Sequence, residues 1–244
     1  MTRPDPTRFI LIGTSHAGNV GAAARAMKVM GFDDLVLVAP RWPNVLTREE
    51  TVQRASGALD VLENARIVDT LDEALEGMSY LCATAMTPRD FGPPTFAPRD
   101  HLPSLAASVA TQGQRVAFVF GSERFGMRNE DVWACHVCLS IPSHPDYGSL
   151  NLAQAVQLIA YDWRCALGGH TVLARTAAPV LADGLEVAGA LDHWQQVLAQ
   201  VGFLDPAVPR RLMPRLQQLV NRAQLTREEL HILRGIARAV AKRC

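Results

Sequence analysis

The first two-thirds of the chain alternates short apolar runs with helical patterns, and this alternation constrains the fold more than any other feature. Near-continuous apolar strands are typical of a parallel sheet that is covered on both faces. Six strand-sized runs rich in Val, Ile, Leu and Phe occur at residues 8–13, 35–40, 65–69, 80–86, 115–121 and 137–142. Helical patterns lie between them at residues 19–30, 47–62, 71–78, 101–110 and 129–135. The sequence therefore predicts an α/β fold with a parallel six-stranded sheet and helices on both faces.

A longer helical pattern at residues 149–167 is apolar on nearly every side. One stripe has six members, and further apolar residues lie on the other faces. The stripe consists of Leu152, Ala155, Val156, Ile159, Ala160 and Trp163, and the other faces carry Leu158, Cys165 and Ala166. A helix that is apolar all round is buried on both sides. We expect one side to face the sheet, with Trp163 in packing contacts, and the other side to face a second copy, so that the protein is a homodimer.

The last third of the chain has a different composition. Residues 168–185 contain Gly168-Gly169, Ala177-Ala178-Pro179 and Asp183-Gly184 and predict a linker, and three amphipathic helices follow at 185–201, 209–223 and 226–242. Residues 186–244 carry nine Lys/Arg and five Asp/Glu in a chain of zero net charge. The predicted organisation is a catalytic domain at 1–167, a linker at 168–185 and a basic helical domain at 186–244. We expect the basic helical domain to bind a polyanion, to contribute to dimerisation, or both. Thr47 and Thr226 are each expected to open a capping box.

Several function classes are disfavoured by composition. No apolar run reaches membrane-spanning length, and the first residues lack a signal-peptide pattern, so we expect a cytoplasmic protein. The five cysteines are an odd number, which favours reduced thiols. Cys135 and Cys138 form a CxxC without the second pair that a zinc site needs, so we interpret them as core residues and expect no metal.

Chemistry is expected in the loops that follow the strands, because ligands of open parallel sheets bind at the carboxyl ends. Four loops there are informative, at residues 13–21, 83–86, 121–126 and 141–151. The glycine spacing of the first loop does not match GxGxxG, and no acid follows the second strand at Val38-Ala39-Pro40-Arg41. A dinucleotide-dependent oxidoreductase is therefore the weaker alternative.

Three segments at these loops resemble motifs of the SPOUT superfamily of RNA 2′-O-methyltransferases. Residues 19–25 (NVGAAAR) resemble its first motif, 119–126 (VFGSERFG) its second, and 141–155, which includes YGSLNLAQA, its third. The resemblance covers about residues 8–167. Together with the helical extension, it is strongest to the branch that methylates cytidine or uridine at position 32 of the tRNA anticodon loop. The related branch that methylates a guanosine ribose, and a non-catalytic RNA-binding member, are the alternatives.

The resemblance implies a trefoil knot near the carboxyl end of the sheet domain, a homodimer, tRNA as partner and S-adenosyl-L-methionine (SAM) as methyl donor. It places SAM against Thr84, Ala85, Met86, Gly121, Ile141, Gly148, Ser149 and Leu150. It makes Arg25 the catalytic arginine, either by anchoring a phosphate beside the 2′-hydroxyl or by accepting its proton, with Ser149 and Asn151 orienting that hydroxyl. Asn19 and Glu123 are expected to fix loops; for Glu123, an ion pair with Arg25 and a direct catalytic role are both open. His16, Arg124 and Arg128 are candidates for RNA contacts, with a solvated role equally open.

Overall fold

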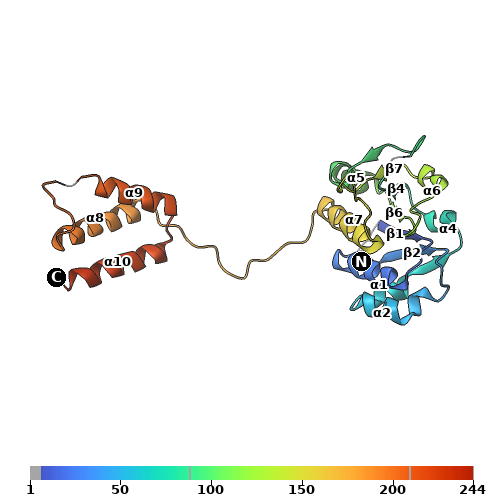
Figure 1. Cartoon of the computed structure of the whole chain (residues 1–244), viewed down its shortest axis with the longest axis horizontal. Helices are drawn as coiled ribbons and strands as arrows, with labels where there is room; N and C mark the ends of the chain where they lie inside the picture. The colour runs from blue at the N-terminus through green and yellow to red at the C-terminus, as the bar shows by residue number, and fades with distance from the viewer. Residues whose placement is uncertain (1–6, 88, 209, 244) are drawn as a thin grey trace. The chain divides into compact units, whose positions relative to one another are not determined.

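The computed structural model describes residues 7–87, 89–208 and 210–243. The chain divides into two compact units, Met1–Thr171 and Val172–Cys244 (Figure 1). The first contains the sheet and the second contains helices alone in its described part. No helix in the described ranges is long and apolar enough to cross a membrane.

The sheet is all-parallel, in the order β3-β2-β1-β6-β4-β7-β5. Six of its strands match the six predicted runs: β1 Thr7–Ile12, β2 Asp34–Val38, β3 Arg66–Val68, β4 Tyr80–Thr84, β6 Val116–Phe120 and β7 Val137–Leu139. The expected count of six is wrong, because β5 (Thr95–Phe96) adds a seventh strand at the edge beside β7. Two residues after a Pro-rich stretch are too short to give a periodic signal.

Helices cover both faces of the sheet, as predicted. Phe9 and Phe118 point into a cluster formed with α1 (Ala17–Val29), α5 (Pro98–Gln112) and α7 (Leu152–Ala166). Ile10 and Val119, their neighbours along the strands, point the other way, toward α4 (Leu71–Leu75) and α6 (Asn129–Trp133). Alternate residues of one strand point to opposite faces, so the central strands are buried on both sides.

The predicted single helix at 47–62 is wrong. The structure has a 3₁₀ turn, Val45–Thr47, then α2 (Glu49–Ala55) and α3 (Leu59–Asn64). Ser56 between the two helices has φ 52°, outside the right-handed helical region, so the first helix ends there and the chain changes direction. The expected capping box at Thr47 is also wrong, because its hydroxyl donates to the carbonyl of Asn44 and α2 begins after Arg48.

Helix α7 buries one face in the chain, and its opposite face is exposed. Trp163 is fully buried, and its indole N–H donates to the Thr7 hydroxyl at 2.8 Å while its ring meets Phe118 edge-on. The predicted packing role of Trp163 is confirmed. Leu158 and Tyr161 remain 38% and 48% exposed on the other side. No residue of the first unit that the structure describes buries that side.

The second unit is a set of three helices, α8 (Gly184–Gln200), α9 (Leu212–Ala223) and α10 (Arg227–Ala241). The capping box predicted at Thr226 is confirmed, with its hydroxyl accepting from the Glu229 N–H and the Glu229 carboxylate accepting from the Thr226 N–H. The Ala182 N–H donates to Leu225 at 2.9 Å, so the end of the predicted linker pairs with this unit.

Candidate active site

A cavity of about 300 Å³ opens at the carboxyl ends of β4, β6 and β7. All eight positions that the sequence assigns to the methyl donor lie in its lining: Thr84, Ala85, Met86, Gly121, Ile141, Gly148, Ser149 and Leu150. The lining also contains residues that the sequence analysis missed, among them Thr87, Arg89, Phe125 and Met127. These follow the same strands by a few residues, and of the four only Phe125 lies within one of the quoted motifs, where no role was assigned to it. The cavity therefore combines apolar walls, small residues and a few polar groups.

Two glycines leave room that a larger residue would fill. A Cβ on Gly121 would lie 2.1 Å from the backbone carbon of Gly126, so the loop after β6 folds back tightly only with glycine there. A Cβ on Gly148 would lie 2.7 Å from Ser143 Oγ and 2.9 Å from Met86 Sδ. Close backbone approach of this kind is what glycine permits, and it leaves carbonyl and N–H groups accessible to a ligand in the cavity.

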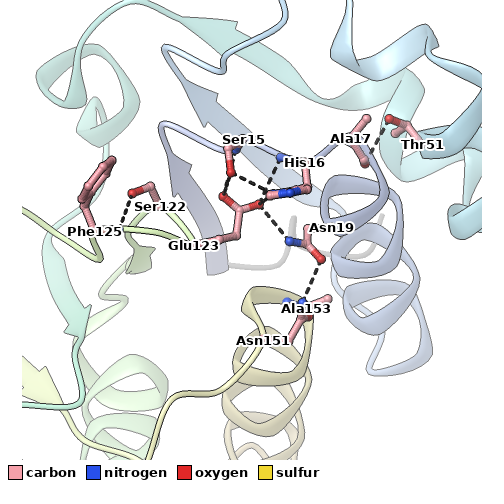
Figure 2. A network of polar contacts seen from close by, with 10 residues as sticks. All are labelled: Ser15, His16, Ala17, Asn19, Thr51, Ser122, Glu123, Phe125, Asn151 and Ala153. Atoms are coloured by element: carbon pink, nitrogen blue, oxygen red, sulfur yellow. Dashed lines mark hydrogen bonds and ion pairs between the residues drawn. The ribbon is translucent and has the colours of Figure 1, made fainter.

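Glu123 is the centre of a polar network at one edge of this cavity (Figure 2). Its carboxylate accepts from the Ser15 N–H at 2.8 Å, the Ser15 hydroxyl at 2.9 Å, the His16 N–H at 3.3 Å and the Asn19 amide at 2.8 Å. Burial raises the pKa of Glu123, but the hydrogen bonds from Asn19 and Ser15 outweigh it, and the pKa lies below its ordinary value. The group is a carboxylate at neutral pH.

The network extends from Asn19 to the start of α7. The Asn151 amide donates to Asn19 Oδ1 at 3.0 Å, and Asn151 Oδ1 accepts from the Ala153 N–H at 2.9 Å as the cap of α7 (Figure 2). Three loops from distant parts of the sequence thus meet through side chains of Asn19, Glu123 and Asn151. Asn19 and Glu123 connect loops through hydrogen bonds, as expected. Asn151 belongs to the same network, because its side-chain amide is occupied by the contacts with Asn19 and Ala153.

The ion-pair alternative for Glu123, with Arg25 as its partner, is wrong. Arg25 is exposed on α1 and makes no hydrogen bond or ion pair with any residue that the structure describes. Glu123 instead contacts the N-terminal end of α1, two turns before Arg25. The sequence showed that Arg25 and Glu123 belong to neighbouring motifs but gave no information on which side of α1 the arginine projects.

The remaining candidates lie around the cavity mouth. Ser149 and Arg124 line it and are exposed. His16 is exposed beside Glu123, with Nδ1 2.9 Å from the Ser15 hydroxyl. Arg128 is bound to Asp131 at 3.1 Å, so it is less available for RNA than Arg124.

The two cysteines of the CxxC are buried, which confirms their interpretation as core residues. Cys135 is 7% and Cys138 2% exposed, and both thiols are free. Burial raises the pKa of Cys135 to about 12 and also raises the pKa of Cys138. Both are therefore neutral thiols at physiological pH.

Comparison with known proteins assigns the chain to a family. The model of the SpoU rRNA Methylase family matches residues 6–161, and that of the C-terminal domain of the tRNA methyltransferase TrmJ matches residues 185–244. The chain belongs to the SpoU methylase family. The expected resemblance and the expected enzyme class, an RNA 2′-O-methyltransferase, are confirmed.

Individual relatives cover nearly the whole chain. The TrmJ protein of Pseudomonas aeruginosa, a tRNA (cytidine/uridine/adenosine-2′-O-)-methyltransferase, is 42% identical over 243 residues, covering 95% of this chain and 92% of its own. A Klebsiella pneumoniae TrmJ is 42% identical over 239 residues, covering 96% and 95%. The crystal structure of TrmJ from Z. mobilis ZM4 matches with a TM-score of 0.78 at 31% identity, covering 96% of this chain and 99% of that one. Within the SpoU methylase family, the chain is therefore similar to TrmJ proteins over nearly its whole length.

Proposed function

We propose that this SpoU methylase transfers a methyl group from SAM to the ribose 2′-hydroxyl of cytidine or uridine at position 32 of the tRNA anticodon loop. The observation that carries the proposal is the convergence of all eight predicted cofactor positions on one cavity beside the Asn19–Glu123–Asn151 network. The TrmJ relatives are named as tRNA cytidine/uridine methyltransferases. Another position in tRNA, or rRNA as the family model's name suggests, is the alternative outcome.

The residues of the cavity suit a nucleoside with a charged tail. The Ile141 and Leu150 side chains supply apolar walls for an adenine, and Gly121 and Gly148 let it approach backbone groups. The Nε of Arg89 is buried at this cavity without a hydrogen-bond partner in the described residues, which leaves one donor for a ligand. A similar fold, the SpoU methyltransferase AviRb, was solved in complex with the cofactor AdoMet.

SAM supplies an electrophilic methyl group on a sulfonium that leaves as a neutral thioether, so the proposal needs no metal. The protein's own task is to place the 2′-hydroxyl in line with that methyl and to assist loss of its proton to solvent as the new C–O bond forms and the S–C bond breaks. A guanidinium stays protonated near neutral pH, so Arg25 is proposed to anchor the target phosphate and stabilise the developing alkoxide rather than to act as a base. Ser149, exposed at the cavity, is proposed to orient the hydroxyl.

The proposal includes a homodimer and the trefoil knot. The exposed Leu158 and Tyr161 of α7 support a second copy, because an apolar helix face next to a binding site is costly to leave in water. The exposed Arg25, unpaired among the residues that the structure describes, also supports a homodimer. In a homodimer, Arg25 of one chain can contribute to the active site of the partner chain. The sheet order, with β7 inserted between β4 and β5, supports a threaded chain.

The test is methylation of unmodified tRNA by the purified protein with SAM, followed by mapping of 2′-O-methyl positions by mass spectrometry. We expect one new 2′-O-methylnucleoside, at position 32. A product elsewhere would refute the position, and no product with tRNA or rRNA would refute the function.

The Arg25→Ala variant tests the proposed role of this arginine. We expect turnover to fall by at least about a hundredfold, because the phosphate anchor and the charge near the alkoxide are both lost. SAM binding, measured by calorimetry, should remain within about twofold, since Arg25 does not line the cavity. Loss of SAM affinity would instead place Arg25 at the cofactor.

A further inference from the structure

A second hollow adjoins the candidate active site on the side of α1 and α2. Its volume is about 480 Å³, and it is lined by His16, Gly18, Asn19, Ala22, Glu50, Arg54, Glu123 and Asn151. Glu123 lines both spaces, so its carboxylate stands at their boundary. Glu50 and Arg54 of α2 belong to none of the motifs that the proposed function uses.

The position of α2 beside this hollow is fixed by buried contacts. The Thr51 hydroxyl donates to the carbonyl of Ala17 at 3.1 Å and to that of Val45 at 2.6 Å; the first contact is drawn in Figure 2. A Cβ on Gly21 would lie 2.0 Å from the Thr51 carbonyl oxygen, so the two helices approach at their backbones. With Thr51 pointing inward, Glu50 and Arg54, four residues apart, lie on one side of α2 and face the hollow.

Both charged groups are free to bind a ligand. Neither Glu50 nor Arg54 makes a hydrogen bond or ion pair with a residue in the described ranges, although their spacing would allow one between them. Glu49, the neighbouring acid, is by contrast bonded to Gln53 at 2.8 Å. The Glu50 carboxylate lies over Gly18, where a Cβ would come within 2.5 Å of its Oε1. The unpaired Glu50 carboxylate, a hydrogen-bond acceptor, and the unpaired Arg54 guanidinium, a hydrogen-bond donor, thus face the same hollow.

We propose that this hollow is a nucleotide subsite for the RNA substrate, in which Arg54 pairs with a phosphate and Glu50 accepts from the amino group of a base. The proposal rests on the proposed function. A guanidinium pairs with phosphate through two parallel hydrogen bonds, and a carboxylate accepts from the N4 amino group of cytosine, which uracil lacks. The pair therefore suits a nucleotide and can distinguish one pyrimidine from the other.

The competing ligand is the amino-acid end of SAM, whose ammonium group could pair with Glu50 and whose carboxylate could pair with Arg54. RNA is favoured by the face of α1 that borders the hollow. Gly18 and Ala22 line it, and Arg25 follows on the same face at the next turn, unpaired like Arg54. Two unpaired guanidinium groups suit consecutive phosphates better than one carboxylate.

A purely structural role for Glu50 is the other reading. Helix α1 has no acidic residue in its first turn, and a carboxylate over Gly18 would complement the partial positive charge of that helix end. Such a role would change the melting temperature and would leave RNA affinity and base preference unchanged.

The test uses the full-length chain and transcribed tRNA. The variants are Arg54→Gln and Glu50→Gln, with Arg66→Gln on β3 and Glu49→Gln on α2 as matched controls outside both spaces. For Arg54→Gln we expect RNA binding, measured by fluorescence anisotropy without SAM, to weaken by about tenfold and the slope of log K against log salt to fall by about 1. For Glu50→Gln we expect the ratio of kcat/KM for target cytidine over uridine to fall by about tenfold. The controls should match the unmodified protein, and all four variants should keep its SAM affinity.

Each other outcome overturns the subsite. Unchanged RNA affinity and salt slope in Arg54→Gln would show that no phosphate binds there. Loss of SAM affinity in either variant would assign the hollow to the cofactor's amino-acid end, and a lower melting temperature alone would leave Glu50 a structural residue. Failure of the proposed function is distinguishable, because the unmodified protein would then bind tRNA with an Arg54-dependent salt slope and form no methylated product.

Discussion

At residue scale, Glu123 holds together segments that are more than a hundred positions apart in the sequence. Its oxygens accept from Ser15 and Asn19 at 2.8 Å each, and Asn19 in turn accepts from Asn151. The resemblance assigned Asn19 and Glu123 to loop fixing, and the structure brings them together. The resemblance could not identify the hydrogen-bond partners of Glu123, because a motif specifies residue types along a chain and not the direction in which each side chain projects.

We expect Glu123→Gln to destabilise the first unit by about 2 kcal/mol at pH 7, because a glutamine turns its NH₂ toward donors that need an acceptor. The folded pKa of Glu123 lies below its unfolded value. Its stabilising contribution is therefore present above the unfolded pKa of about 4.3 and is lost as pH falls through the lower folded pKa. Urea unfolding of both proteins from pH 7 to pH 3 should show the difference shrinking on acidification. A difference independent of pH would contradict a role for the charge.

The buried thiols lead to a second prediction at this scale. Cys82 and Cys135 are buried, and burial raises the pKa of Cys82 well above its ordinary value and that of Cys135 to about 12. At pH 8 only about one Cys135 in ten thousand is thiolate, the form that reacts. Iodoacetamide followed by peptide mass spectrometry should therefore modify the exposed Cys165 and leave Cys82, Cys135 and Cys138 unmodified until urea is added. Rapid alkylation of Cys135 in the folded protein would show that the CxxC is accessible.

At the scale of elements, most strand positions were predictable because buried parallel strands need continuous apolar runs, and runs as short as these favour strands over helices. The break between α2 and α3 was not predictable in the same way. The apolar period continues through Ala55, Ala58, Val61 and Leu62, all buried against the same cluster, so two short helices give the pattern of one long helix. The helix breaks at Ser56, whose φ is 52°, and the following Gly57 makes a Ser-Gly dipeptide, a turn signal that the continuing apolar period outweighed in the prediction.

The close contact of α1 with α2 gives an element-scale prediction. Gly21→Ala should destabilise the first unit by about 2 kcal/mol, since its Cβ would lie 2.0 Å from the Thr51 carbonyl oxygen and 2.9 Å from the Ala55 nitrogen. Alanine normally stabilises a helix by about 1 kcal/mol relative to glycine. Gly235→Ala in α10, with nothing within 4 Å, is the matched control and should stabilise the second unit. Thermal unfolding measures both, and equal stabilisation by the two changes would refute the tight contact.

At the scale of the whole molecule, the two units have separate packing and separate family matches. The cavity, the polar network and the second hollow are all formed by residues 15–155. The basic excess predicted for residues 186–244 lies in the three-helix unit. We propose that the first unit carries chemistry and the second contributes RNA affinity, in line with the match to the TrmJ C-terminal domain.

Limited trypsin digestion tests this division of labour. Residues 168–179 are exposed and contain one trypsin site, Arg175, whereas the preceding Arg164 is bound to the Met30 carbonyl at 2.6 Å. Exposed segments without helix or strand are cut first, so a fragment ending at Arg175 should accumulate, and Arg175→Gln should abolish it. The purified fragment should bind SAM as the full chain does, because both cavities lie within it, and should bind tRNA more weakly because it lacks the basic helices. Equal tRNA affinity in fragment and full chain would mean that the second unit does not bind the RNA, and loss of SAM binding would mean that the cavity needs both units.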